Sequence, residues 1–329
     1  MTVIGDYLAT LTREFGAGWN RFWFTPADVS TLGAIRLGAG LVLLYWLATF
    51  TPDLTAYFGP DGLAPQSILR NLEEPVRDGR LFVVPQQVRE SLPRPHRWSL
   101  LNLLHTPKEL MLGHTAALVI ALLFAVGLFT RVTTPLALLV LLSYIHRGPV
   151  FTSQVEPILA FVMLYLCFGP AGKAWSFDHW LALRRHSRQL TAGDVMKCRK
   201  SSAAAISLRL IQVHLALVYA LMAIGKLSSP VWWQGTGVWW LIARADAPLV
   251  DLTGLHSFPH LVSIWTYAVV LWQATLPILI WHPLARPLLL VVNAIMWGLL
   301  APVTGLLDCA LMMVIASLAF VPRVGRHDI

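Results

Sequence analysis

The sequence predicts an all-α polytopic integral membrane protein, a bundle of about six to eight transmembrane helices preceded by an N-terminal amphipathic helix. Of its 329 residues, 56% are hydrophobic and only 13% are charged, and the mean hydropathy is +0.63. Soluble domains carry about 25% charged residues, so water would solvate this chain poorly. The apolar residues also gather in long runs divided by polar turns, as membrane spans do.

The first segment, residues 1–32, is predicted to begin with a helix lying in the membrane interface. Apolar residues recur there at helical spacing between polar ones: Leu8, Leu11, Phe15, Trp19 and Phe22. An amphipathic helix of this kind buries its apolar face among lipid headgroups. No secretory signal is recognised in this stretch. Thr25 and Pro26 are expected to be the N-cap and first residue of the next helix.

Eight apolar segments follow, and together they predict one membrane domain over residues 1–329. They lie at about 33–50, 110–130, 133–146, 155–170, 203–225, 262–281, 285–301 and 303–321. A full span needs roughly 20 residues and at least about 17, so the third, fourth and seventh are short spans or half-spans. A long extracytoplasmic loop (51–109) and a basic cytoplasmic loop (171–202) connect the segments.

The basic residues predict a bacterial plasma-membrane topology with both termini in the cytoplasm. Short outside loops and their helix ends hold only Arg147, Lys226 and Arg244. The inside stretches hold Arg13, Arg21, Arg131, Lys173, Arg184, Arg185, Arg188, Lys197, Arg199, Lys200, Arg286, Arg323 and Arg326. Positive charge collects on the cytoplasmic side, which accounts for the net charge of +8 without a nucleic-acid partner. The lipid bilayer is the expected partner.

Ionisable residues within spans are costly and therefore indicate function or pairing. Arg36 and Arg209 fall near the cytoplasmic ends of their spans, where snorkelling to headgroups is expected. Glu156, Lys226 and Asp308 fall together near the outer ends of the fourth, fifth and last spans. They predict an outward-facing polar pocket around Lys226. The alternative is that each charge marks a helix end and faces water.

His146, at the outer end of the third segment, is a further candidate for this pocket. Two tryptophan pairs, 232–233 and 239–240, follow Lys226. They fit an aromatic belt at headgroup level, and the alternative is that Trp232 and Trp233 wall a flat aromatic ligand. His214 and Gln273 lie mid-span, where interhelical hydrogen bonds are the common role.

No metal site or disulfide framework is predicted. The three cysteines are far apart: Cys167, Cys198 and Cys309. His256 and His260 form an H-x3-H pair interrupted by proline, without the glutamate of a zinc-protease motif. The sequence shows no glycine-rich phosphate loop, nucleophile elbow or nucleotide fingerprint, and no internal repeat of the kind typical of transporters.

Three stretches resemble one family. They are LGAIRLGAGLVLLYWLATFTPDLTAYFGPDGLAP (32–65), LCFGPAGKAWSFD (166–178) and HLALVYALMAIGKLSSPVWWQGTGVWW (214–240). Together, in order along the chain, they resemble the horizontally transferred transmembrane (HTTM) domain, the membrane part of vitamin K-dependent gamma-carboxylases. The third carries that family's tyrosine, Lys-Leu and Trp/Gly pattern, which places Tyr219 and Lys226 among the residues of interest.

The resemblance implies that Lys226 is a catalytic base acting on vitamin K hydroquinone or another quinone. In the carboxylases this lysine deprotonates the hydroquinone, and oxygen then generates the strong base that carboxylates glutamate. A lysine removed from water loses its proton more readily, and the neutral amine accepts one. A nearby Asp308 carboxylate would instead keep Lys226 charged.

Several departures from the family weigh against carboxylation. The carboxylases have histidines where this chain has Val155 and a residue at or near Met296, and many relatives have an acidic residue where it has Gln273 ahead of Pro277. Their large extracytoplasmic domain has no counterpart here. The leading expectation is therefore quinone or lipid binding, or maturation of an exported peptide or protein. The alternatives are a non-catalytic scaffold or maturation partner, and a true carboxylase/epoxidase using Lys226.

Overall fold

The computed structural model describes residues 2–59, 62–63, 98–148, 151–186, 200–245 and 248–321, and it confirms the all-α class. Each predicted apolar segment forms a helix. The bundle helices are α2 (Val29–Thr49), α6 (Pro107–Val126), α7 (Thr130–Arg147), α8 (Val155–Phe168), α11 (Ser202–Leu227), α14 (Pro259–Leu279), α15 (Ala285–Thr304) and α16 (Leu307–Ser317), which continues into η5 (Leu318–Phe320).

Five of these helices are long and apolar enough to cross a membrane: α2, α6, α11, α14 and α15. Helices α8 and α16 with η5 are shorter and also apolar. These lengths and compositions are those of an integral membrane protein. The number of spans beyond these five stays a prediction.

Shorter elements connect the bundle helices. They are α3 (Leu54–Phe58), η1 (Leu100–Leu103), η3 (Ala171–Lys173), α9 (Phe177–His186), α12 (Pro230–Trp233), α13 (Gly237–Ala243) and η4 (Thr253–Ser257). The predicted loop 51–109 therefore holds α3 and η1 within its described part, and the predicted loop 171–202 begins with η3 and α9. Cys198 lies outside the described residues, whereas Cys167 and Cys309 are free thiols.

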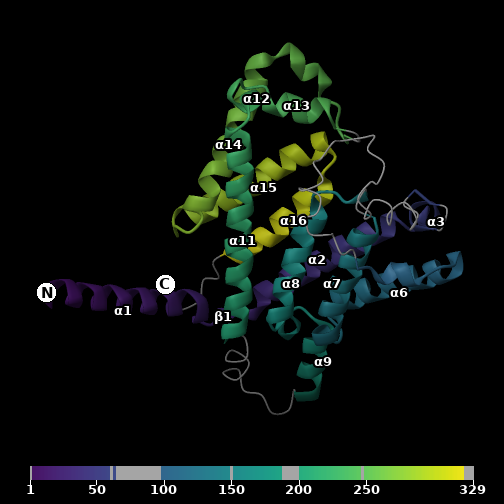
Figure 1. Cartoon of the computed structure of the whole chain (residues 1–329), viewed down its shortest axis with the longest axis horizontal. Coiled ribbons are helices and arrows are strands. Elements are labelled where there is room, and N and C mark those ends of the chain that lie inside the picture. Colours follow the sequence, from purple (N-terminus) through teal and green to yellow (C-terminus); the bar gives the residue numbers. More distant parts are fainter. Residues whose placement is uncertain are drawn as a thin grey trace, which may run out of the picture.

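Helix α2 lies at the centre of the bundle and packs against α6, α8 and α16 (Figure 1). Close packing depends on glycine, because a Cβ at Gly40 would lie 2.5 Å from the Ala125 Cα of α6. Gly33 lies equally close to the backbone of Ala174. Small residues let membrane helices approach in this way, so the first stretch of the family resemblance forms the centre of the fold.

The predicted start of α2 is wrong by three residues. Asp28, rather than Thr25, is the N-cap, and its carboxylate accepts a hydrogen bond from the Ser30 backbone N–H at 2.8 Å. The residues before α2 are extended because β1 (Ala27–Asp28) pairs antiparallel with β2 (Lys200–Ser201). Pairing with a strand more than 170 residues later in the chain thus moves the start of α2 toward the C-terminus.

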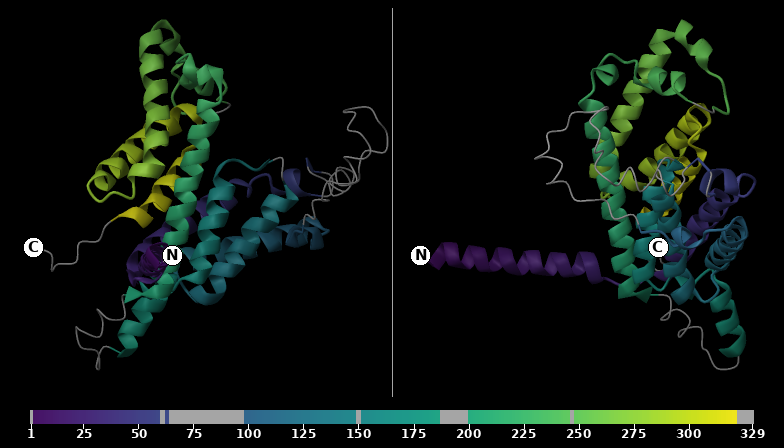
Figure 2. Two further views of the ribbon diagram at one scale, coloured as in Figure 1. Left: turned by 60° about the vertical axis from the view of Figure 1, so that its left-hand side comes forward. Right: turned by 45° about the vertical axis from the view of Figure 1, so that its right-hand side comes forward.

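Helix α1 (Thr2–Phe24) extends away from the bundle and runs across α11 rather than along it (Figures 1 and 2). The contacts described next join its last turn to α11. Arg209 of α11 donates to the Phe22 carbonyl at 3.1 Å and to Gln212 Oε1 at 2.9 Å, and its guanidinium lies 4.5 Å from the Phe22 ring centre. Arg209 is partly exposed, and its Nε and Nη1 bind these protein groups, so its predicted snorkelling to headgroups stays a prediction.

For Arg36 the same expectation is wrong, because it is fully buried and not directed to headgroups (0% exposed). Its guanidinium donates only to backbone carbonyls, from the end of α6 and from the turn between α8 and α9: Phe124 (2.5 Å), Ala125 (2.9 Å), Ala171 (3.3 Å) and Trp175 (2.6 Å). The first two stretches of the resemblance therefore meet at this arginine.

Candidate functional site

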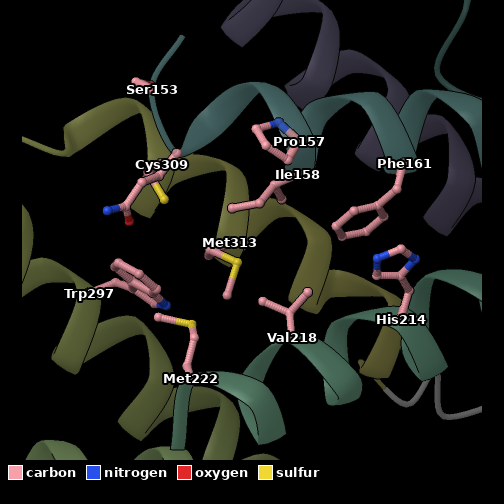
Figure 3. Close-up of a pocket in the computed structure, with 11 residues that line it drawn as sticks. Ser153, Pro157, Ile158, Phe161, His214, Val218, Met222, Trp297, Cys309 and Met313 are labelled. Atoms are coloured by element: carbon pink, nitrogen blue, oxygen red, sulfur yellow. The ribbon is translucent and has the colours of Figure 1, made fainter. Parts of the chain in front are cut away.

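A cavity of about 570 Å³ lies between α8, α11, α15 and α16 (Figure 3). Most of its lining is apolar or aromatic: Ser153, Gln154, Pro157, Ile158, Phe161, His214, Val218, Met222, Trp297, Cys309 and Met313. Figure 3 shows the Phe161 and His214 rings at one side, Trp297 at the other, and Met222, Met313 and Val218 between them. Helices α8 and α11 and the consecutive helices α15 and α16 therefore line one partly open space.

Helix α11 supplies His214, Val218 and Met222 at four-residue intervals, which places them along one stripe of the helix. The His214 imidazole stacks on Phe161 with ring centres 3.9 Å apart and an interplanar angle of 11°. Its Nδ1 hydrogen-bonds the Tyr165 hydroxyl at 2.7 Å, which confirms the predicted interhelical bond. Within the described residues Nε2 has no partner, so it can bind a ligand.

At the other side of the cavity, Trp297 connects the lining to a buried polar chain. Its indole N–H donates to the Tyr219 hydroxyl at 2.7 Å, and that hydroxyl donates to Asn293 Oδ1 at 2.5 Å. Tyr219 is fully buried and lies behind Trp297 rather than in the cavity wall. It can hold the indole in place but does not line the cavity.

Gln273 and Asn293 each keep a buried polar atom without a partner. Among the described residues, Gln273 Oε1 and Asn293 Nδ2 have no hydrogen-bond partner. The interhelical bond expected at the Gln273 carbonyl is therefore not formed. Buried unpaired polar atoms cost free energy, so the centre of α14 and α15 is less fully satisfied than the Arg36 region.

Glu156 and Asp308 lie on neighbouring helices beside the cavity. Glu156 is buried (1% exposed) and accepts from the Trp46 indole N–H at 2.9 Å and the Ser153 backbone N–H at 2.7 Å. Asp308 is half-buried, and the two carboxylates interact electrostatically. The structure thus brings these two predicted residues near each other, and Glu156 does not face water.

Lys226 is not paired with either carboxylate. In the described part of the chain, no carboxylate oxygen lies within 4.0 Å of its ammonium, which sits 4.7 Å from the Trp232 ring centre. Lys226 is one turn beyond Met222 on the same face of α11, but it is not among the residues that line the cavity. The predicted pocket around Lys226 is therefore corrected: the lysine lies next to the cavity and forms no salt bridge with Asp308.

The two tryptophans after Lys226 point in different directions. The Trp232 ring packs so closely on Gly237 that any Cβ there would collide with it. Trp233 is 64% exposed, and its indole donates to the Leu227 carbonyl at 2.6 Å. Trp232 is thus fixed between Lys226 and Gly237, whereas Trp233 faces outward.

His146 does not join these residues. Its Nδ1 hydrogen-bonds the Trp98 carbonyl at 2.8 Å, and it does not line the cavity. Cys309, Met313, Phe161 and Trp297 do line it, yet none was singled out from the sequence as a site residue. A signal was present, because Pro157/Phe161 and Cys309/Met313 are i, i+4 pairs that share a helix face.

Comparison with known proteins leaves the family open. No family model, curated protein or solved structure matches the chain. Among the described residues, no group of three histidine, cysteine or acidic side chains could hold a metal ion. The HTTM resemblance and an exported peptide or protein substrate stay predictions.

Proposed function

We propose that this multi-pass membrane protein binds a flat, apolar ligand of the quinone class between α8, α11, α15 and α16. The observation that carries the proposal is the cavity of about 570 Å³ with the Phe161–His214 stack at one side and Trp297 at the other. Ligand sites are usually 300–1,000 Å³, mainly apolar, with a few oriented polar groups. This cavity has that size and composition.

A quinone ring matches the chemistry of these walls. Aromatic faces stack on flat rings, and the thioethers of Met222 and Met313 adapt to irregular apolar shapes such as an isoprenoid tail. Tyr165 binds His214 Nδ1, and Nε2, which has no partner among the described residues, can bond a quinone oxygen. The ring nitrogen therefore orients the ligand within an otherwise apolar space.

Lys226 is proposed as the base that acts on the reduced ligand. Its neutral amine would take the proton of a hydroquinone hydroxyl, breaking the O–H bond and leaving the hydroquinone anion beside an ammonium. The Trp232 ring, 4.7 Å away, stabilises that ammonium by a cation–π contact. No carboxylate among the described residues holds the lysine charged beforehand.

The proposed topology keeps both termini cytoplasmic and α1 in the membrane interface. Leu8, Leu11 and Phe15 on α1 are exposed, and Phe15 stacks on Trp19 of the same helix, which suits burial among headgroups. Exposed tryptophans occur at both ends of the bundle, as aromatic belts do: Trp175 and Trp180 at one end, Trp233 and Trp240 at the other.

Two experiments test the proposal. Lipid extracts of the purified protein are examined by mass spectrometry for quinone. Binding of added menaquinone is then measured for Val218→Trp, which fills the cavity with a larger side chain, and for Val213→Trp. Val218 lines the cavity and Val213 is exposed on another face of α11, so the second variant is the matched control.

We expect Val218→Trp to weaken quinone binding at least about tenfold and Val213→Trp to leave it unchanged. Equal quinone binding by the two variants would show that the ligand sits elsewhere. If the extracts hold only phospholipid and added quinone does not bind, the quinone proposal is wrong and the cavity holds a lipid.

A further inference from the structure

A second cavity, of about 750 Å³, lies at the opposite end of α11 from Lys226. It is formed by the start of α7, the end of α8, the turn that includes η3, and α9. Phe129 and Trp175 on these connections are largely exposed, as are Phe177 and Trp180 in α9. Aromatic side chains gather at headgroup depth in membrane proteins, so this cavity is expected at the level of lipid headgroups.

The charges that line this cavity are mainly positive. Two cations, Arg131 and Lys173, line it together with one carboxylate, that of Asp178, and the His179 ring also lies in the lining. Asp178 is already committed, because its oxygens accept from the backbone N–H groups of Phe129 (2.9 Å) and Thr130 (3.0 Å) at the start of α7. Arg131 and Lys173 are exposed and their charges remain available to an anion.

The remaining wall is apolar. Val132, Pro135 and Leu166 line the same cavity, beside the exposed thiol of Cys167. A small soluble anion would use only the basic side chains, whereas a phospholipid presents a phosphate and an acyl chain side by side. The combination of basic and apolar walls at headgroup level therefore matches an anionic phospholipid.

We infer that the cavity formed by α7, η3 and α9 is a binding site for an anionic phospholipid. Arg131 and Lys173 pair with its phosphate, and the exposed side chains of Val132 and Pro135 contact an acyl chain. Each basic side chain near anionic lipid strengthens binding roughly fivefold. The site is separate from the proposed quinone cavity, which α11, α15, α16 and the other end of α8 line.

Native mass spectrometry of the full-length protein tests this site. The protein is offered phosphatidylglycerol or phosphatidylcholine with identical acyl chains. The double variant Arg131→Gln/Lys173→Gln is compared with Lys108→Gln/Arg244→Gln, which removes the same charge from exposed side chains outside this cavity. We expect the first variant to lose at least about tenfold of the preference for phosphatidylglycerol and the second to keep it.

A second readout uses Cys167, which lines the cavity. Peptide mass spectrometry follows its maleimide labelling and separates it from the other two cysteines. Phosphatidylglycerol should slow this labelling in the wild-type protein and not in Arg131→Gln/Lys173→Gln. The site would be rejected if that double variant kept its lipid preference or if lipid left the labelling rate of Cys167 unchanged. Displacement of the lipid by inorganic phosphate alone would mean that the cavity binds only the free anion.

Discussion

Arg36 and Lys226 are both cations within long apolar helices, and the protein treats them in opposite ways. Arg36 is fully buried, and its guanidinium donates to four backbone carbonyls. Lys226 is half-buried, and its described contact is with one aromatic ring. Arg36 makes four hydrogen bonds from its five N–H groups and so holds the fold together, whereas Lys226 has donors left over for chemistry.

Arg36 needs no carboxylate in direct contact because backbone carbonyls supply its acceptors, two of them at the end of α6. The last carbonyls of a helix have no intrahelical donor and carry partial negative charge, and α6 presents two of these to Arg36. Gly127, the residue after α6, has φ +79°, and a Cβ there would lie 2.5 Å from an Arg36 nitrogen. Glycine is thus required where the guanidinium reaches the helix end.

The contrast between Arg36 and Lys226 requires that Arg36 stabilise the fold. Replacing Arg36 should therefore cause the largest loss of stability. Arg36→Leu removes the donor from three buried carbonyls, at about 1–3 kcal/mol each, and from the part-buried carbonyl of Trp175. We therefore expect stability to fall by at least about 3 kcal/mol, measured by thermal unfolding in detergent. Arg36→Lys should rescue only part, because an ammonium lacks the planar fork. The control Arg244→Leu removes an exposed arginine and should change stability little. Equal stability of the two leucine variants would refute the structural role of Arg36.

A smaller loss is expected from Asp178, which holds the same region from the other side. Asp178→Ala removes the acceptor for the Phe129 and Thr130 N–H groups at the start of α7. Loss of a helix cap of this kind costs about 0.5–2 kcal/mol.

Asp251 provides the matched control for that measurement. It also accepts a backbone N–H, that of Thr253 at 2.8 Å, but in an exposed turn. Asp251→Ala should therefore lower the thermal midpoint less than Asp178→Ala does. The reverse order would show that the start of α7 does not depend on Asp178.

Local pattern predicted the helices well and their long-range partners poorly. The segment expected at 203–225 is α11, Ser202–Leu227, because uninterrupted apolar sequence determines a span by itself. The role of Arg36 depends on carbonyls 88 to 139 residues away in the chain, which no spacing rule reaches. Helical periodicity likewise shows that His214 and Met222 share a stripe, but only the packed neighbours show that this stripe faces a cavity.

Replacing Lys226 is expected to have the smallest effect on stability and a large effect on the proposed proton transfer. Lys226→Met removes one cation–π contact, about 0.5–2 kcal/mol, so the protein should fold and bind quinone nearly as the wild type does. The rate at which bound hydroquinone loses its proton, followed by absorbance after a pH jump, should fall at least about a hundredfold. Lys226→Arg keeps the charge but cannot act as a base, because arginine stays protonated; it should lose the rate and keep the binding. A rate unchanged in both variants would make Lys226 a second structural cation, whereas loss of binding together with the rate would make it a ligand contact rather than the base.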